Sequence, residues 1–348
     1  MPLQYAGGFA ETVAEVGQYE DVGLDVVTLP EAYSFDAVSQ LGFLAARTST
    51  LRLASSILNI YSRTPSLIAM TAAGLDYVSG GRFELGIGAS GPQVVEGFHG
   101  VRYDAPIGRT REVVDICRQV WRREPLVHDG TYYHLPLTPE HGGSGAGKPL
   151  KLINHPVRPE IPIMLAALGP KNVELAAEVG DGWQPMFYLP EASAETFGGW
   201  LAAGAARRSP DRSPLDIVVG TQMLISEDPA AVEAALDTVR SQIALYVGGM
   251  GAKGKNFYND LACRYGFEAA AAEIQDLYLA GHKDKAAAAV PDALVRGLAL
   301  VGPPGHVRER VAAFAASGVT TLMASPLATT HARRLEDVAR LKEYATDL

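Results

Sequence analysis

The sequence of 348 residues has little cysteine, no long basic run and no apolar stretch of membrane-spanning length. Its two cysteines, Cys117 and Cys263, lack metal-binding spacing, and Cys117 is expected in the core of an apolar helical face. The net charge of -9 argues against nucleic acid and anionic membranes as partners. The N-terminus has neither a basic start nor a long apolar core, so we expect no signal peptide and a soluble, cytoplasmic protein.

The usual signatures of catalytic side chains are also missing. The sequence contains no cluster of His, Asp and Glu with metal-ligand spacing, no Gly-x-Ser-x-Gly nucleophile motif and no lysine at the end of an apolar run. This absence argues against a metal-dependent hydrolase and a Schiff-base enzyme. It favours a protein whose bound cofactor supplies the chemistry.

What the sequence does contain is an alternation of short apolar runs with helix-like segments. Hydrophobic residues make up 47% and charged residues 20%, which is enough for a large core. Asp36 is placed to cap one helix, and Pro65 suits the first turn of the next. The eight apolar runs cover residues 3–6, 26–29, 51–57, 83–87, 163–167, 182–186, 215–225 and 319–324.

Eight strand-and-helix units without a long break in composition predict one α/β domain over residues 1–348, a (β/α)8 barrel. Insertion segments are expected at about residues 136–162 and 248–285. The first is a long loop after a short hairpin, and the second carries a helical piece near residues 268–279. A doubly wound open sheet is the alternative. That fold places its glycine fingerprint after the first strand, and Gly7 and Gly8 do not match it.

The segment SGGRFELGIGASG, residues 79–91, carries three glycines in and after an apolar run: Gly86, Gly88 and Gly91. Glycine weakens a strand, so these positions indicate a close approach by a flat ligand or by another part of the chain. A tight turn with nothing bound explains them equally well.

In a barrel, the active site lies at the carboxyl ends of the strands. Glu31 directly follows a run, which indicates either a functional acid or an ion pair across the strand ends. His99 lies in the loop after the fourth run, as a proton donor or as a satisfied loop histidine. The other residues at the expected strand ends are small or apolar: Gly7, Gly8, Ser55, Ser56, Ile57, Gly88, Ala89, Ser90, Ala167, Leu168, Gly169, Pro185, Met186 and Thr221.

Gly169 and Pro170 open a predicted helix over residues 170–179. Free N–H groups and the positive end of the helix dipole would hold a phosphate there, although most such helix starts bind nothing. Tyr33 and Tyr61 are expected as walls of a site rather than as acids.

The run IYSRTPSLIAMTAAGLDYVSGGRFELGIGASGPQVVEGFHG, residues 60–100, resembles the bacterial-luciferase-like superfamily, and in particular its branch that uses the deazaflavin coenzyme F420. A weaker similarity extends over most of the chain and includes AALGPKNVELAAEVGDGW, residues 166–183. The segment GKNFYNDLACRYG, residues 254–266, resembles one actinobacterial subgroup of that branch.

The resemblance implies a set of roles for the strand-end residues. It places a non-prolyl cis peptide at Ser56–Ile57, beside Ser55, as a bulge behind the ring of the cofactor. Glu31 falls where relatives carry an acid at the edge of the ring. The ring is expected to lie against Gly88, Ala89 and Ser90, and the coenzyme phosphate at Ala167, Leu168, Gly169 and Pro170.

One position departs from the family pattern. Several deazaflavin enzymes carry a histidine for proton transfer directly after that acid, whereas this sequence has Ala32. The role is then vacant, or is taken by Glu31, His99 or a tyrosine. An exposed cation such as Arg63 would favour binding of the anionic tail of the coenzyme.

The implied function is hydride transfer between C5 of coenzyme F420 and a small organic substrate, in a homodimer without a metal. An FMN-dependent monooxygenase of the same fold is the alternative, and a protein that only carries the coenzyme is the third possibility.

Overall fold

The computed structural model describes residues 1–3, 8–251 and 253–347. The chain divides into two compact units. The extent of one domain over residues 1–348 stays a prediction, and most of the first predicted strand, with Gly7, lies outside the described residues. The first unit comprises Met1–Ala167, Glu174–Trp183 and Gly204–Leu215, and the second comprises Leu168–Val173, Gln184–Ala203 and Asp216–Leu348.

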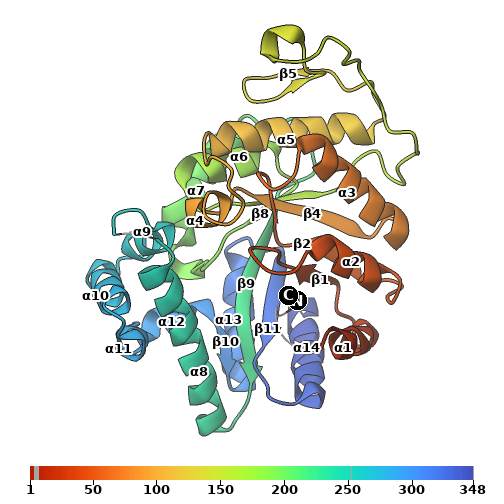
Figure 1. Ribbon diagram of the computed structural model, residues 1–348. Helices are drawn as coiled ribbons and strands as arrows, with labels where there is room; N and C mark the ends of the chain where they lie inside the picture. The colour runs from red at the N-terminus through yellow and green to blue at the C-terminus, as the bar shows by residue number, and fades with distance from the viewer. Residues whose placement is uncertain (4–7, 252, 348) are drawn as a thin grey trace. The chain divides into compact units, whose positions relative to one another are not determined.

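The first unit is built on a sheet of parallel strands (Figure 1). Its strands are β1 (Val26–Leu29), β2 (Arg52–Ser55), β3 (Leu58–Asn59), β4 (Phe83–Gly88), β7 (Ile163–Ala166) and β8 (Gly182–Gln184). β1 pairs with β2, β2 with β4 and β4 with β7, all in parallel, and β8 follows β7 in the strand order. All six residues of β4 are buried, as expected for a parallel strand covered on both faces.

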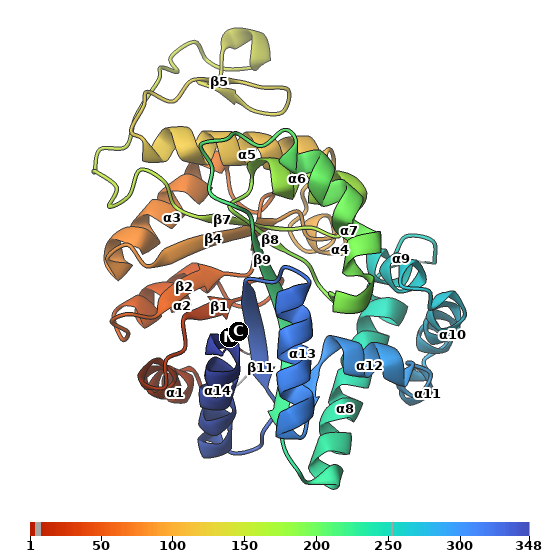
Figure 2. The same cartoon turned by 180° about the vertical axis from the view of Figure 1, so that it is seen from behind.

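Helices accompany these strands where the apolar pattern predicts them, except for the short helix Pro92–Val95, which the pattern does not indicate. They are α1 (Phe9–Asp21), α2 (Ala37–Ala45), α3 (Pro65–Ser79), α4 (Pro92–Val95), α5 (Pro106–Trp121) and, shared with the second unit, α6 (Pro170–Val179). Asp36 caps α2 by accepting the Ser39 N–H at 2.8 Å, and α3 begins at Pro65 and ends at Gly80 with φ 68°. α3 packs along α5, where the Trp121 indole donates to the Ala69 carbonyl at 2.9 Å (Figure 2).

The predicted hairpin comes directly before the first insertion segment. Its antiparallel strands are β5 (His128–Asp129) and β6 (His134–Leu135), and a short 3-10 helix (Pro139–His141) follows. The rest of residues 136–162 is a long loop held at Arg158. The Arg158 guanidinium binds the carboxylate of Asp76, which is 1% exposed, and donates to the Phe83 carbonyl at 2.6 Å.

The second unit contains the last strands of the sheet order. β9 (Asp216–Ile225) pairs in parallel with β10 (Leu300–Gly302) and with β11 (Thr321–Pro326). The apolar pattern missed β10, as it missed β3, because two or three residues are too few to show a period. The helices of this unit are α7 (Pro190–Ala205), α8 (Pro229–Ala244), α9 (Phe257–Arg264), α10 (Glu268–Leu279), α11 (Lys283–Ala288), α12 (Asp292–Leu298), α13 (Pro304–Ala316) and α14 (His331–Thr346).

The second insertion segment is more helical than predicted. α10 has the expected bounds, but α9 and α11 were not foreseen, and α8 passes into a π-helical stretch (Leu245–Gly249). Val247, Ile274 and Ala286 join these elements to the core around Leu236. Among residues 1–3, 8–251 and 253–347, we find no helix with the length and apolarity needed to cross a membrane.

Candidate functional site

Most of the predicted site residues lie at the carboxyl ends of the first unit's strands. Because parallel strands run in one direction, these ends meet at one edge of the sheet. Leu168, Gly169 and Pro170 belong to the second compact unit, so their role in holding a phosphate stays a prediction. The residues at the ends of β1, β2, β4 and β7 are Glu31, Ser55, Ser56, Ile57, Gly88, Ala89, Ser90 and Ala167.

Ile57, Gly88 and Ala166 lie side by side near the strand ends, and we call this group the wall. The Ser56–Ile57 peptide is cis, as the resemblance implied. A Cβ atom added to Gly88 would lie 3.1 Å from Ile57 Cδ1 and 3.3 Å from Ala166 Cβ. The Gly88 carbonyl accepts the Ile60 N–H at 3.1 Å, which fixes the bulge against the end of β4. The wall therefore consists of backbone and two small aliphatic groups, a surface against which a planar ring can lie.

Gly86 is a glycine for a different reason. A Cβ atom there would overlap the Ser55 carbonyl oxygen. The Ser55 hydroxyl donates to the Gly86 carbonyl and accepts the Gly86 N–H, both at 2.9 Å. The sequence left open whether these glycines reflect a close approach or only a tight turn, and at Gly86 the structure shows the close approach of another strand. The Ser55 side chain joins β2 to β4, and its part in cofactor binding stays a prediction.

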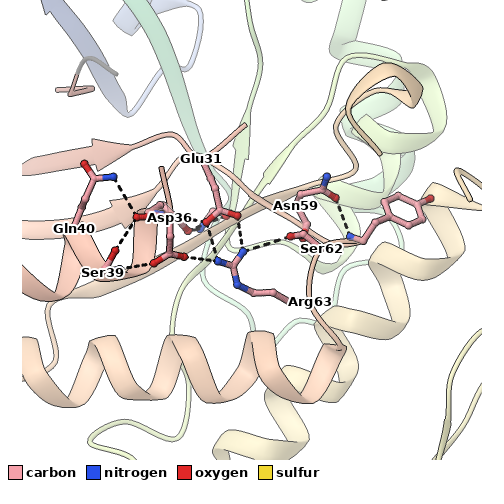
Figure 3. Close-up of polar contacts among 11 residues, drawn as sticks. Glu31, Asp36, Ser39, Gln40, Asn59, Ser62 and Arg63 are labelled. Carbon is pink, nitrogen blue, oxygen red and sulfur yellow. Dashed lines mark hydrogen bonds and ion pairs between the residues drawn. The ribbon is translucent and has the colours of Figure 1, made fainter. Parts of the chain in front are cut away.

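Glu31 is engaged in a buried ion pair. Arg63 Nη1 lies 2.6 Å from Glu31 Oε1 and Arg63 Nη2 lies 2.8 Å from Oε2, while Arg63 Nη2 also lies 2.8 Å from Asp36 Oδ1 (Figure 3). Glu31 is 8% exposed and accepts the Ala37 N–H at 3.2 Å as well. The hydrogen bond to Glu31, which outweighs partial burial, raises the pKa of Arg63. The structure shows the ion pair, and a role for Glu31 in proton transfer stays a prediction.

Arg63 is thus not the exposed cation expected from the sequence. Its side chain is only 14% exposed and lies between two carboxylates. The missed signal is that Glu31 and Arg63 each follow a strand, so the parallel sheet brings them together although they are 32 residues apart. The pair fixes the loop after β1, because Glu31 and Asp36 bracket residues 32–35.

Two residues just beyond strand ends have a left-handed backbone. Ala32 has φ 43° after β1, and Ser90 has φ 57° after β4. Such conformations cost about 1–3 kcal/mol for residues other than glycine, and they cluster at functional sites. Ala32 has no ionisable side chain, so it cannot take part in proton transfer.

His99 offers an imidazole from the neighbouring loop. It follows α4, and its backbone N–H donates to the Val94 carbonyl at 3.1 Å. Its Nε2 atom is buried and has no hydrogen-bond partner within the part of the chain that the structure describes. Thr28 Oγ1 on β1 and Asn59 Nδ2 on β3 share this property, and neither was singled out from the sequence. Buried polar atoms without partners call for an explanation, of which a bound ligand is one.

The tyrosines near these ends are protonated hydrogen-bond donors. The Tyr61 hydroxyl donates to the Asp104 carbonyl at 2.6 Å, and the Tyr103 hydroxyl to the Ser90 carbonyl at 3.5 Å. Burial raises the pKa of both phenols. Both phenols are therefore protonated at neutral pH, and the role of Tyr61 as a wall of the site stays a prediction.

In the second unit, α6 starts as the sequence predicts. The Gly169 carbonyl accepts the N–H groups of Asn172 and Val173 at 3.1 and 3.0 Å, and a Cβ atom on Gly169 would meet no atom within 4 Å. The helix start is therefore accessible.

Comparison with known proteins gives a consistent set of relatives. The family model described as luciferase-like monooxygenase matches residues 1–321. A Mycobacterium tuberculosis protein provisionally named a coenzyme F420-dependent oxidoreductase is 46% identical over 317 residues, covering 90% of this chain and 89% of that protein. The 5,10-methylenetetrahydromethanopterin reductase of Archaeoglobus fulgidus is 29% identical, covering 88% and 87%.

Solved structures agree on the fold. The coenzyme F420 dependent tetrahydromethanopterin reductase of Methanopyrus kandleri matches with a TM-score of 0.78 at 22% identity, covering 97% of this chain and 96% of that chain. An FMN-bound Baeyer-Villiger monooxygenase component of Pseudomonas putida matches at 0.65 and 21%, covering 98% and 93%. The prediction of a (β/α)8 barrel is confirmed.

Proposed function

The chain belongs to the luciferase-like monooxygenase family, and we propose that within it the protein is a coenzyme F420-dependent oxidoreductase that transfers a hydride between the deazaflavin C5 and an organic substrate. The similarity over 90% of the chain to a relative provisionally named for that coenzyme carries this proposal. It is supported by the second relative, a methylenetetrahydromethanopterin reductase, and by the fold of a coenzyme F420 dependent reductase.

The strand ends of the first unit fit a flat ring that brings its own chemistry. Ile57, Gly88 and Ala166 leave a surface without side-chain projections at Gly88. No group of His, Cys, Asp and Glu that could hold a metal occurs among the residues that the structure describes. When bound, the coenzyme supplies a carbon that accepts or donates a hydride and that reacts poorly with oxygen. The chain itself supplies binding, shielding of one face and a proton.

We propose that His99 is the residue that donates or accepts this proton. Its buried Nε2 atom is without a partner in the described part of the chain and can hold or release a proton toward a bound molecule. Glu31 is tied to Arg63 and Ala37, so its contribution is to hold the loop after β1 in place. This division of labour gives His99 the role that Ala32 cannot fill.

Titration of the purified protein with coenzyme F420 and, separately, with FMN tests the proposal. We expect saturable binding of coenzyme F420, followed by its absorbance and fluorescence, and much weaker binding of FMN. Tight FMN binding without coenzyme F420 binding would contradict the proposal and support the monooxygenase alternative, whose fold is shared by the FMN-bound neighbour. Binding of coenzyme F420 without turnover of any substrate in a panel would support a carrier.

A further inference from the structure

Two aromatic side chains on the loops after β1 and β4 are in contact with each other but are largely exposed. Tyr33 is 63% exposed and Phe98 is 65% exposed. Their ring centroids lie 6.4 Å apart, and the ring planes are inclined by 52°. Single exposed aromatics are common on protein surfaces. A contacting pair from two strand-end loops is a local apolar patch, and such patches mark binding sites.

Both rings stand on fixed turns. On the first loop, Arg63 joins the carboxylates of Glu31 and Asp36, and the Ser34 N–H donates to the Glu31 carbonyl at 3.0 Å. On the second loop, the N–H groups of Phe98 and His99 both donate to the Val94 carbonyl at 3.1 Å. A pair of rings held in this way loses little conformational entropy when it binds a partner.

The spacing suits a flat partner. Carbon atoms in contact lie about 3.5–4.0 Å apart, so a planar molecule between two rings needs them about 7–8 Å apart. The observed 6.4 Å is short of that by about one ångström. Rotation of the two side chains from their inclination of 52° toward parallel planes would make the room, whereas a saturated, puckered molecule would need a still larger separation.

Polar groups beside the pair limit the chemistry of the partner further. His99, the neighbour of Phe98, has a buried Nε2 atom without a partner in the described chain. This atom can form a hydrogen bond with an oxygen or nitrogen atom of the partner. Glu31, Arg63 and Asp36 together carry one negative charge beside Tyr33. An anionic partner is therefore disfavoured.

We propose that Tyr33 and Phe98 form a clamp for the substrate, and that this substrate is an uncharged, planar aromatic or conjugated molecule with a hydrogen-bonding atom for His99. The substrate class rests on the proposed function, because it assumes that the clamp serves the oxidoreductase reaction. Binding by the clamp itself does not depend on the coenzyme.

Three probes of matched size test the clamp in the full-length protein. 2-Acetylnaphthalene is planar and neutral, 2-acetyldecalin is neutral but saturated and puckered, and 2-naphthoate is planar but anionic. Binding is measured by ligand-observed NMR and calorimetry, with and without coenzyme F420. We expect 2-acetylnaphthalene to bind the most tightly of the three, by about tenfold.

Variants of the loops supply the controls. Tyr33→Ala and Phe98→Ala should each weaken binding of 2-acetylnaphthalene by about tenfold, and Tyr33→Phe should restore it because the ring is kept. Phe35→Ala is the matched control, since Phe35 lies on the same loop and is 76% exposed. It should change the affinity less than twofold.

The clamp is refuted if 2-acetylnaphthalene does not bind, if the other two probes bind equally well, or if Phe35→Ala weakens binding as much as Tyr33→Ala. A lower molar mass of Tyr33→Ala or Phe98→Ala by light scattering would also overturn it, because the patch would then join two copies of the chain. Coenzyme F420 affinity is measured in the same samples. If the probe binds but coenzyme F420 does not, the result counts against the proposed function alone. If coenzyme F420 binds but the probe does not, the result counts against the clamp alone.

Discussion

Replacing Arg63 by methionine removes the guanidinium but keeps a side chain of similar length. Glu31 would then be a carboxylate with a 10% exposed side chain, paired only with the Ala37 N–H. Breaking a buried ion pair from one side costs about 3–5 kcal/mol. Because both side chains keep some contact with water, we expect Arg63→Met to lower the free energy of unfolding by about 3 kcal/mol, at the lower end of that range.

The same substitution should release the loop that carries Tyr33. We therefore expect a weaker substrate interaction, seen as a higher KM, together with a loss of thermal stability of several degrees. Urea unfolding at pH 7 measures the change in stability.

A double-mutant cycle with Glu31→Gln isolates the pair. The coupling between Arg63→Met and Glu31→Gln should be at least about 1.5 kcal/mol. Asp36→Asn is the matched control, because Asp36 has a 51% exposed side chain and asparagine caps helices equally well. That variant should cost less than about 1 kcal/mol. A coupling near zero, or a cost for Asp36→Asn equal to that of Arg63→Met, would show that the buried pair does not hold this loop.

Three further substitutions test other parts of the structure. The Cβ of Gly88→Ala would crowd Ile57 and Ala166, so this variant should weaken coenzyme F420 binding more than tenfold while lowering the free energy of unfolding by only about 1 kcal/mol. An unchanged affinity in a fluorescence titration would show that this wall is not part of the binding site. His99→Gln should lower kcat about a hundredfold with little change in coenzyme affinity; an unchanged kcat would exclude it as the proton donor. Burial, opposed by the charge of Arg333, raises the pKa of Asp337 to about 6 from 3.8. Between these two pKa values the folded protein holds a proton that the unfolded chain releases. The free energy of unfolding should therefore decrease as the pH rises from about 4 to about 6, by at most about 3 kcal/mol. Melting curves of Asp337→Asn should show a smaller decrease over the same pH range.

Local signals in the sequence predicted the elements of the fold well where the physics is local. Asp36 as a cap and Pro65 at a first turn act on neighbouring residues, and both helices begin where these signals place them. α10 is predicted with its bounds because twelve residues suffice to show a helical apolar pattern. β3 and β10 exist only through pairing with β4 and β9, so no local pattern marks them.

The site shows the same division between local and non-local information. The strand-end residues of the first unit are predicted correctly as neighbours, because a parallel sheet fixes which ends meet. The partner of Glu31 is not predicted, since Arg63 reaches it across the sheet and a sequence does not give side-chain directions. Thr28 and Asn59 were overlooked because a polar residue in a short apolar run has no distinctive spacing.

Gly86 and Gly88 show how one motif can carry two causes. They are two residues apart on β4, so their missing side chains would point to the same face of the sheet. At Gly86 the space is filled by the Ser55 backbone, and at Gly88 it is bounded by the side chains of Ile57 and Ala166. Backbone cannot retreat without breaking the β2–β4 pairing, whereas side chains can shift by a few tenths of an ångström. The first glycine is therefore required by the fold, whereas a side chain at the second would only press on Ile57 and Ala166, and the contact of Gly88 with a cofactor stays a prediction.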